Sequence, residues 1–210
     1  MLPRCSIALT VTMATDLARI VESIRSCYAF EGVSLVAVGA GGGQLVDVYR
    51  DARRVIAIDT DAEAVARLEA RLRSTGIRGR FELVAGDFLA CTGRVDAVLF
   101  EFSLHEMPDP LGALEHARAL GTDIVIADHA PDSRWAWHAA EEDKVAAAWA
   151  AVERLGAKHA RDFGGEQVFE DRAALEARLA SQGPEARRRA GELPASGEVR
   201  IPMKHRVAVL

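Results

Sequence analysis

Apolar residues along this chain gather in short continuous runs that alternate with stretches in which they recur every three or four positions. Short runs of this kind are typical of strands that are buried on both faces. The wider spacing, as at Leu17, Ile20 and Ile24, is typical of amphipathic helices. The pattern predicts strands at residues 34–38, 55–58, 81–84, 97–102 and 123–127, and helices at residues 14–28, from 45, around 65–72, 111–120, 143–155 and 171–179.

Alternating strands and helices predict an α/β fold in which helices cover both faces of a mostly parallel sheet. Ligands of such sheets bind at the carboxyl ends of the strands. The last third departs from this alternation, with a turn expected at Gly164 and Gly165. There we expect residues 187–193 and 199–210 to be extended and to pair antiparallel at the edge of the sheet.

Composition narrows the class of protein. The 210 residues are 50% hydrophobic and 27% charged, as in a globular protein with one core, and the net charge is −5. A net negative charge argues against a nucleic-acid coat protein. The charge is uneven, because residues 184–206 carry six basic and three acidic residues. We interpret Arg187–Arg189 as the solvated face of an edge strand, with attraction of an anionic substrate as the alternative.

The cysteines and the N-terminal region point to a cytoplasmic protein. Cys5, Cys27 and Cys91 are widely spaced and include no CxxC pair, which argues against disulfides and a cysteine zinc site. The apolar run at residues 7–13 is interrupted by threonines and makes a poor signal peptide. No apolar stretch approaches the roughly 20 residues of a membrane-spanning helix.

A glycine-rich loop follows the first predicted strand. Glycines stand at positions 39, 41, 42 and 43, where a tight turn lets backbone amides approach a ligand. A dinucleotide-binding loop has its third glycine five positions after the first, and Gln44 stands there instead. The loop therefore disfavours, without excluding, an NAD(P)-dependent oxidoreductase.

Acidic residues follow the next two strands. Asp59 ends the second strand, where a carboxylate accepts hydrogen bonds from ribose hydroxyls. Asp87 follows the third strand and is suited to the exocyclic amine of adenine, with Phe88 beside the ring. Three loops at one edge of the sheet thus suit an adenosine.

At this point the sequence resembles the class I S-adenosylmethionine-dependent methyltransferases. The resemblance rests on VAVGAGGG (36–43), AIDTD (57–61), VAGDF (84–88) and DAVLFEFSLHEMPDP (96–110), and it spans roughly residues 14–130. It implies a Rossmann-like three-layer sandwich, with a mostly parallel seven-stranded sheet and an antiparallel closing strand. It also implies S-adenosyl-L-methionine as the cofactor.

The resemblance assigns roles residue by residue. Gly39, Gly41 and Gly43 are expected near the methionine part of the cofactor, Asp59 and Thr60 at the ribose, Asp87 and Phe88 at the adenine, and Glu101 beside the methyl group. Ala37 departs from the family, which usually has an acidic residue two positions before the first glycine. Either a neighbour such as Glu101 replaces that contact, or cofactor affinity is weakened and the protein is a degenerate relative.

The acceptor side of the site is less defined by sequence. His129, directly after the fifth strand, is the first candidate for a general base, and His105 is the second. Trp135 and Trp137 would face the same side of an extended segment and wall the substrate together with His138. For each of these side chains, packing within the fold is the alternative interpretation. Four residues could in principle converge on a metal, namely His105, His129, His138 and Glu142, but no HxxxH-type spacing supports one, and none is expected.

These patterns predict one methyltransferase domain over residues 1–210, with a cofactor-binding core at 14–130, a substrate cap at about 131–165 and a closing strand pair at 184–210. We expect it to methylate a small molecule, without a nucleic-acid or membrane partner, and a homodimer is left open. The alternatives are a non-catalytic S-adenosylmethionine-binding or regulatory protein of the same fold and, ranked below it, the oxidoreductase.

Overall fold

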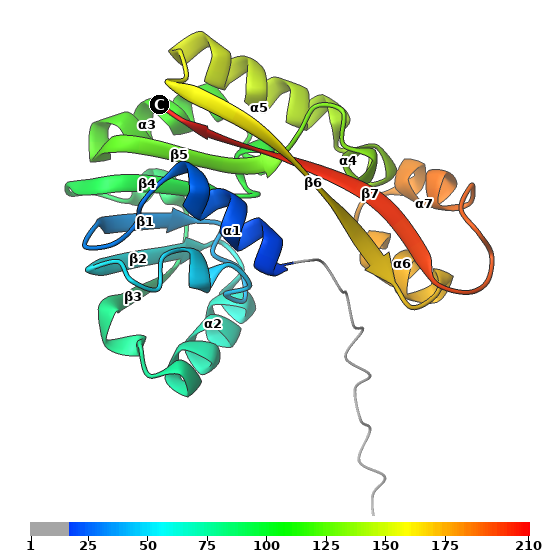
Figure 1. The fold of residues 1–210 in the computed structure, drawn as a ribbon, viewed down its shortest axis with the longest axis horizontal. Coiled ribbons are helices and arrows are strands. Elements are labelled where there is room, and N and C mark those ends of the chain that lie inside the picture. Colours follow the sequence, from blue (N-terminus) through cyan, green and yellow to red (C-terminus); the bar gives the residue numbers. More distant parts are fainter. Residues whose placement is uncertain (1–16) are drawn as a thin grey trace, which may run out of the picture.

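The computed structural model describes residues 17–210 and contains one seven-stranded sheet in the order β3-β2-β1-β4-β5-β7-β6 (Figure 1). Strand β7 pairs antiparallel with both β5 and β6, and the other pairs are parallel. This confirms the predicted fold class. The strands are β1 (Ser34–Val38), β2 (Arg54–Asp59), β3 (Phe81–Ala85), β4 (Val95–Glu101), β5 (Gly121–His129), β6 (His159–Phe169) and β7 (Val199–Val209).

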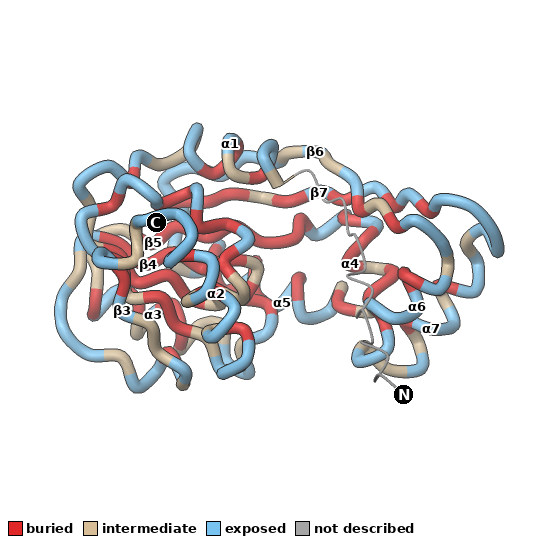
Figure 2. The backbone as a smooth tube through the Cα atoms, turned by 90° about the horizontal axis from the view of Figure 1, so that it is seen from below, coloured by how far each residue is buried: buried red, intermediate tan, exposed pale blue. Residues whose placement is uncertain are grey.

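Helices cover both faces of the sheet. The helices are α1 (Leu17–Cys27), α2 (Ala62–Thr75), α3 (Pro110–Leu120), α4 (Arg134–His138), α5 (Glu142–Leu155), α6 (Arg172–Leu179) and α7 (Pro184–Ala190), with short 3-10 turns η1 (Val46–Val48), η2 (Arg78–Arg80), η3 (Phe88–Ala90) and η4 (Leu104–Glu106). Leu35 and Ala37 pack with α1 and α2 on one face, and Val36 and Val38 pack with α3 and α5 on the other. Burial of successive residues explains the continuous apolar runs of the strands, which Figure 2 shows as buried tube through the centre of the sheet.

The sheet changes direction of winding between β1 and β4, which are neighbours although two strands separate them in sequence. Such a switch point leaves a crevice at the carboxyl ends of the two strands, where ligands bind in open α/β sheets. Gly39 directly follows β1, and Glu101 is the last residue of β4. The fold thus brings the glycine loop and this carboxylate to the same edge.

The segment at residues 187–193 was predicted as a strand, and this prediction is wrong. Most of it belongs to helix α7, and the outer partner of β7 is β6. Strand β6 runs through Gly164 and Gly165, where a turn was expected. The helix forms because Pro184 stands in its first turn and Glu185 pairs with Arg188 and Arg189 at helical spacing.

The region over the carboxyl edge therefore differs from the predicted cap at residues 131–165. Strands β6 and β7 project beyond the sheet, and α6 and α7 lie at their far end, with α4 near the projecting strands (Figure 1). We call α4, α6 and α7, with the projecting ends of β6 and β7, the cap. The later part of the predicted cap, residues 159–165, belongs to β6 instead.

The helix predicted from residue 45 is only the 3-10 turn η1. Val46, Val48 and Tyr49 are all buried, and positions two apart cannot share one face of an α-helix. The helix predicted at residues 14–28 is confirmed as α1 (Leu17–Cys27). Residues 14–16 lie outside the described residues, as do Cys5 and the run at 7–13.

Cys27 and Cys91 are free thiols. Within residues 17–210, no helix combines the length and the apolar character that crossing a membrane requires.

Candidate active site

Two cavities adjoin at the carboxyl edge of the sheet. The larger, of about 480 Å³, is lined by Asp59, Thr60, Asp87 and Phe88. The smaller, of about 280 Å³, is lined by Glu101, His129 and Trp135. Gly39 and Phe102 line both cavities, so the predicted adenosine site and the predicted acceptor site are neighbours across the switch point.

The glycine loop is shaped by contacts within the protein as well as by space for a ligand. A Cβ atom on Gly39 would lie 2.4 Å from Cβ of Ser103, and one on Gly43 would lie 2.6 Å from Cδ1 of Leu68. Both glycines have positive φ, which other residues adopt at a cost. Of the three predicted glycines, only Gly39 lines the two cavities, so it is the one placed to approach a cofactor.

Backbone amides fix the orientation of both predicted adenosine carboxylates. Asp59 accepts hydrogen bonds from the amides of Gly41 (2.8 Å) and Asp61 (2.9 Å), one on each oxygen. Asp87 accepts from the amide of Leu89 at 2.9 Å. Each carboxylate oxygen has a second lone pair, so both groups can still accept hydrogen bonds from hydroxyl or amine donors. The residues present therefore fit an adenosine.

Phe88 forms part of the core and of the cavity wall at the same time. It is buried and packs edge-to-face on Phe100 (5.4 Å between ring centroids) and on His116 (5.0 Å). The sequence left packing and adenine contact as alternatives, and this position is compatible with both.

Glu101 is buried at the end of β4, and its Oε1 has no hydrogen-bond partner among the described residues. Burial raises the pKa of this carboxyl to about 8, with a smaller upward contribution from the negative charge of Asp59 and an opposing one from the Tyr49 hydroxyl. A desolvated acid without a partner is costly unless a ligand satisfies it. Ala37 is buried in β1, so Glu101 is the acid available to a cationic group here.

The two histidines predicted to be catalytic lie together but differ in environment. Their ring centroids are 5.4 Å apart. Nδ1 of His105 lies 2.6 Å from Oδ1 of Asp128, and hydrogen bonds to Asp128 and Glu106 outweigh burial and raise the pKa of His105 to about 10. Burial lowers the pKa of His129 to about 4, and its Nδ1 has no partner among the described residues.

Asp128 and Glu141 are two buried acids near the histidines to which the sequence pattern assigned no role. Asp128 is the buried residue before His129 at the end of β5, and Glu141 is buried between α4 and α5. An acid at the end of an apolar strand was a usable signal for Asp128. Nothing in the sequence around Glu141 marked it as buried, because it adjoins Glu142 and Asp143 in a charged stretch.

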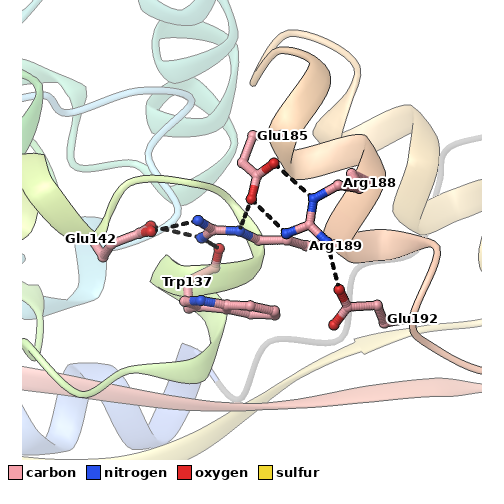
Figure 3. Close-up of polar contacts among 6 residues, drawn as sticks. All are labelled: Trp137, Glu142, Glu185, Arg188, Arg189 and Glu192. Atoms are coloured by element: carbon pink, nitrogen blue, oxygen red, sulfur yellow. Dashed lines mark hydrogen bonds and ion pairs between the residues drawn. The ribbon is translucent and has the colours of Figure 1, made fainter.

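The predicted pair of tryptophans is split. Residues 134–138 form helix α4, in which positions two apart point in different directions. Trp135 lines the smaller cavity and stacks on Phe169. Trp137 lies under the guanidinium of Arg189, which also contacts Glu142 (Figure 3). His138 is buried and, like Trp137, does not line either cavity.

Comparisons with known proteins agree with this fold. Residues 36–122 match the family model described as a methyltransferase domain. No curated protein sequence matches.

Among solved structures, a candidate methyltransferase from Bacillus halodurans is 15% identical, with a TM-score of 0.65 over 90% of this chain and 97% of that one. A candidate RNA methyltransferase from Pyrococcus horikoshii (16%, TM-score 0.54, 92% and 83%) and an S-adenosylmethionine-dependent methyltransferase from Aquifex aeolicus (17%, 0.51, 90% and 89%) are also similar. At such identities the likeness concerns the fold.

The sheet order is that of a Rossmann-like α/β fold, and both cavities lie at its switch point. The match to a methyltransferase domain covers residues 36–122, which hold the glycine loop, Asp59, Asp87 and Glu101. This part of the chain is therefore similar to S-adenosylmethionine-dependent methyltransferases, and its residues fit that cofactor. The resemblance drawn from the four sequence motifs is confirmed.

Proposed function

We propose that this protein transfers a methyl group from S-adenosylmethionine to a small molecule held in the smaller cavity. The observation that carries the proposal is the pair of adjoining cavities, which share Gly39 and Phe102. The acids proposed to bind ribose and adenine line the larger cavity, and Glu101 and His129 line the smaller one. The bound cofactor supplies an activated methyl group, and the protein contributes alignment of the acceptor with it.

In this proposal Asp59 and Thr60 hold the ribose, and Asp87 and Phe88 hold the adenine. Glu101 replaces the acid missing at Ala37 and pairs with the ammonium group of the cofactor, whose methionine part passes Gly39 into the smaller cavity beside the acceptor. That role supports a working binding site rather than the alternative of a degenerate relative.

The acceptor would contact Trp135 and His129, because both line the smaller cavity. His105 is held by Asp128 and is poorly placed to receive a proton. The guanidinium of Arg178 lies 5.7 Å from the Trp135 ring centroid at the same cavity, and its charge favours an acceptor with an anionic group. A cavity of about 280 Å³ suits a small acceptor rather than RNA.

Calorimetry with S-adenosylhomocysteine tests the cofactor site. Asp59→Ala should weaken binding by about 1.5 to 3 kcal/mol, the value of a hydrogen bond to a charged group. Asp132→Ala is the control, because Asp132 is an exposed acid that pairs with Lys204 and lines neither cavity. If Asp59→Ala bound S-adenosylhomocysteine as tightly as the wild type, Asp59 would not be a cofactor-binding residue.

Turnover separates the catalytic alternatives. Radiolabelled methyl transfer should occur with members of a panel of small anionic nucleophiles and not with RNA. Binding of S-adenosylhomocysteine without transfer to any panel member would favour the non-catalytic protein, and binding of NAD in its place would favour the oxidoreductase.

A further inference from the structure

We propose that His105, His129 and Glu141 form a binding site for a divalent transition-metal ion. Each residue offers one ligand atom, and the three atoms lie within 4.8 Å of one another. All three side chains are buried, and they come from η4, the end of β5 and the junction of α4 with α5. This site goes beyond methyl transfer and does not depend on it.

Asp128 holds the ring of His105 and the backbone of His129. It accepts hydrogen bonds from the backbone amides of His105 (3.1 Å) and His129 (2.8 Å), and its Oδ1 lies 2.6 Å from Nδ1 of His105. A carboxylate bonded to one ring nitrogen is the usual partner of a metal-binding histidine, because it fixes the tautomer and turns the other nitrogen toward the metal. The remaining nitrogen of His105, Nε2, lies 3.8 Å from Oε2 of Glu141.

His129 adds a nitrogen that the protein itself leaves unsatisfied. Its Nδ1 is buried and has no hydrogen-bond partner in residues 17–210. A buried polar atom without a partner calls for an explanation, and an imidazole nitrogen is a common metal ligand.

The three proposed ligand atoms need to move only locally to bind one ion. Nitrogen and oxygen ligands at about 2.0 to 2.1 Å from a tetrahedral ion stand roughly 3.3 Å apart. Nε2 of His105 and Oε2 of Glu141 are 3.8 Å apart, close to this distance. The most distant ligand atoms lie within 4.8 Å of each other, so side-chain rotation has to shorten that distance by about 1.5 Å. Oε1 of Glu106 lies 3.4 Å from Nε2 of His105, at the rim, and is placed to be a further ligand.

Charge and ligand type indicate the class of ion. Asp128, Glu141 and Glu106 surround His105, and Lys144 at the rim contacts Glu106. Two imidazoles and a carboxylate suit Zn²⁺, Co²⁺ or Fe²⁺ better than Mg²⁺ or Ca²⁺, which prefer oxygen ligands.

A metal here would link the cap to the sheet and border the smaller cavity. Glu141 follows Ala140, whose positive φ of 57° is unusual for a residue with a side chain and fixes where Glu141 leaves α4. His129 lines the cavity that also contains Glu101. Three protein ligands leave at least one coordination position, as in catalytic metal sites, and an acceptor oxygen could occupy it.

Titration of the chelator-treated full chain with Co²⁺, without S-adenosylmethionine, tests the site. We expect one equivalent to bind and to give visible d–d absorption, and Zn²⁺ to displace it. Glu141→Gln and His129→Asn should each weaken binding tenfold or more, whereas His159→Asn, an exposed histidine on β6, should leave it unchanged. Asp128→Asn should weaken binding about 10- to 100-fold.

The proposal is overturned if the folded wild-type chain binds no Co²⁺ in the micromolar range, or if Glu141→Gln binds as the wild type does. Circular dichroism reports folding of each variant, and Glu141→Gln keeps the shape of the residue if His129→Asn fails to fold. Binding of S-adenosylhomocysteine is measured separately on the same samples, so failure of the metal site is distinguishable from failure of the proposed methyltransferase.

Discussion

At the scale of single residues, the proposal is that a buried acid on one strand takes the place of an acid missing from another. Ala37 lies in β1, and Glu101 ends the neighbouring β4, so both belong to the same switch point. The sequence could suggest this exchange, because both positions were visible in recognisable motifs. It could not reveal that Glu101 is desolvated, which depends on packing around Tyr49 and the glycine loop.

Cofactor binding should release a proton from Glu101. The pKa of about 8 leaves this carboxyl mostly protonated at pH 7, and pairing with an ammonium group favours its ionised form. The affinity for S-adenosylhomocysteine should therefore rise with pH between about 6 and 8 and level off above. Tyr49 and Asp59 face Glu101, and burial raises the pKa of Tyr49, so its hydroxyl stays neutral in this range.

Calorimetry at pH 7 in buffers of different ionisation enthalpy measures this proton. Glu101→Gln should abolish the release and weaken binding. Glu82→Gln serves as the control, because Glu82 is an exposed acid of β3 that pairs with Arg54. This variant should change neither the proton release nor the affinity. A wild-type protein that binds without proton release would contradict the pairing of Glu101 with the cofactor.

At the scale of elements, the hydrophobic runs predicted the central parallel strands because most residues of β1, β4 and β5 are buried, whereas in β3, at the edge of the sheet, only Phe81 is. The errors lie where the pattern was ambiguous. Val46 and Val48 gave a 3-10 turn in place of a helix, and Arg187–Arg189 were assigned to a strand although ion pairs with Glu185 favour a helix. Partners distant in sequence, such as β6 for β7, cannot be read from local periodicity.

The glycine loop should tolerate a side chain at one position and not at the next. Gly43→Ala places Cβ 2.6 Å from Cδ1 of buried Leu68 on α2, at a positive φ, and should lower the free energy of unfolding by about 1 to 3 kcal/mol. Gly42→Ala meets its nearest neighbour, Nε of Arg67, only at 3.5 Å and should change stability little. Urea unfolding measures the free energy of unfolding of both variants. Equal values would show that the loop rearranges to accommodate the extra methyl group of Gly43→Ala.

At the scale of the whole molecule, a single side chain joins two helices of the cap to α5. Arg189 on α7 pairs with Glu142 at 2.6 Å, donates a hydrogen bond to the carbonyl oxygen of Trp137 on α4, and stacks over the Trp137 ring at 4.5 Å (Figure 3). Its side chain is only 11% exposed. The sequence showed a basic tail, and only the fold shows that one of its arginines holds the cap together.

Arg189→Ala should therefore loosen the cap while leaving the sheet intact. Because the pair with Glu142 is partly exposed, we expect a loss of about 1 to 2 kcal/mol in the free energy of unfolding. Limited proteolysis should cut the α6–α7 region faster than in the wild type, whereas affinity for S-adenosylhomocysteine should persist, since Arg189 lines neither cavity.

Arg200→Ala, which removes exposed ion pairs on β7, is the control and should not increase cleavage. Unchanged proteolysis of Arg189→Ala would mean that apolar packing, such as Trp135 on Phe169, is sufficient to hold the cap.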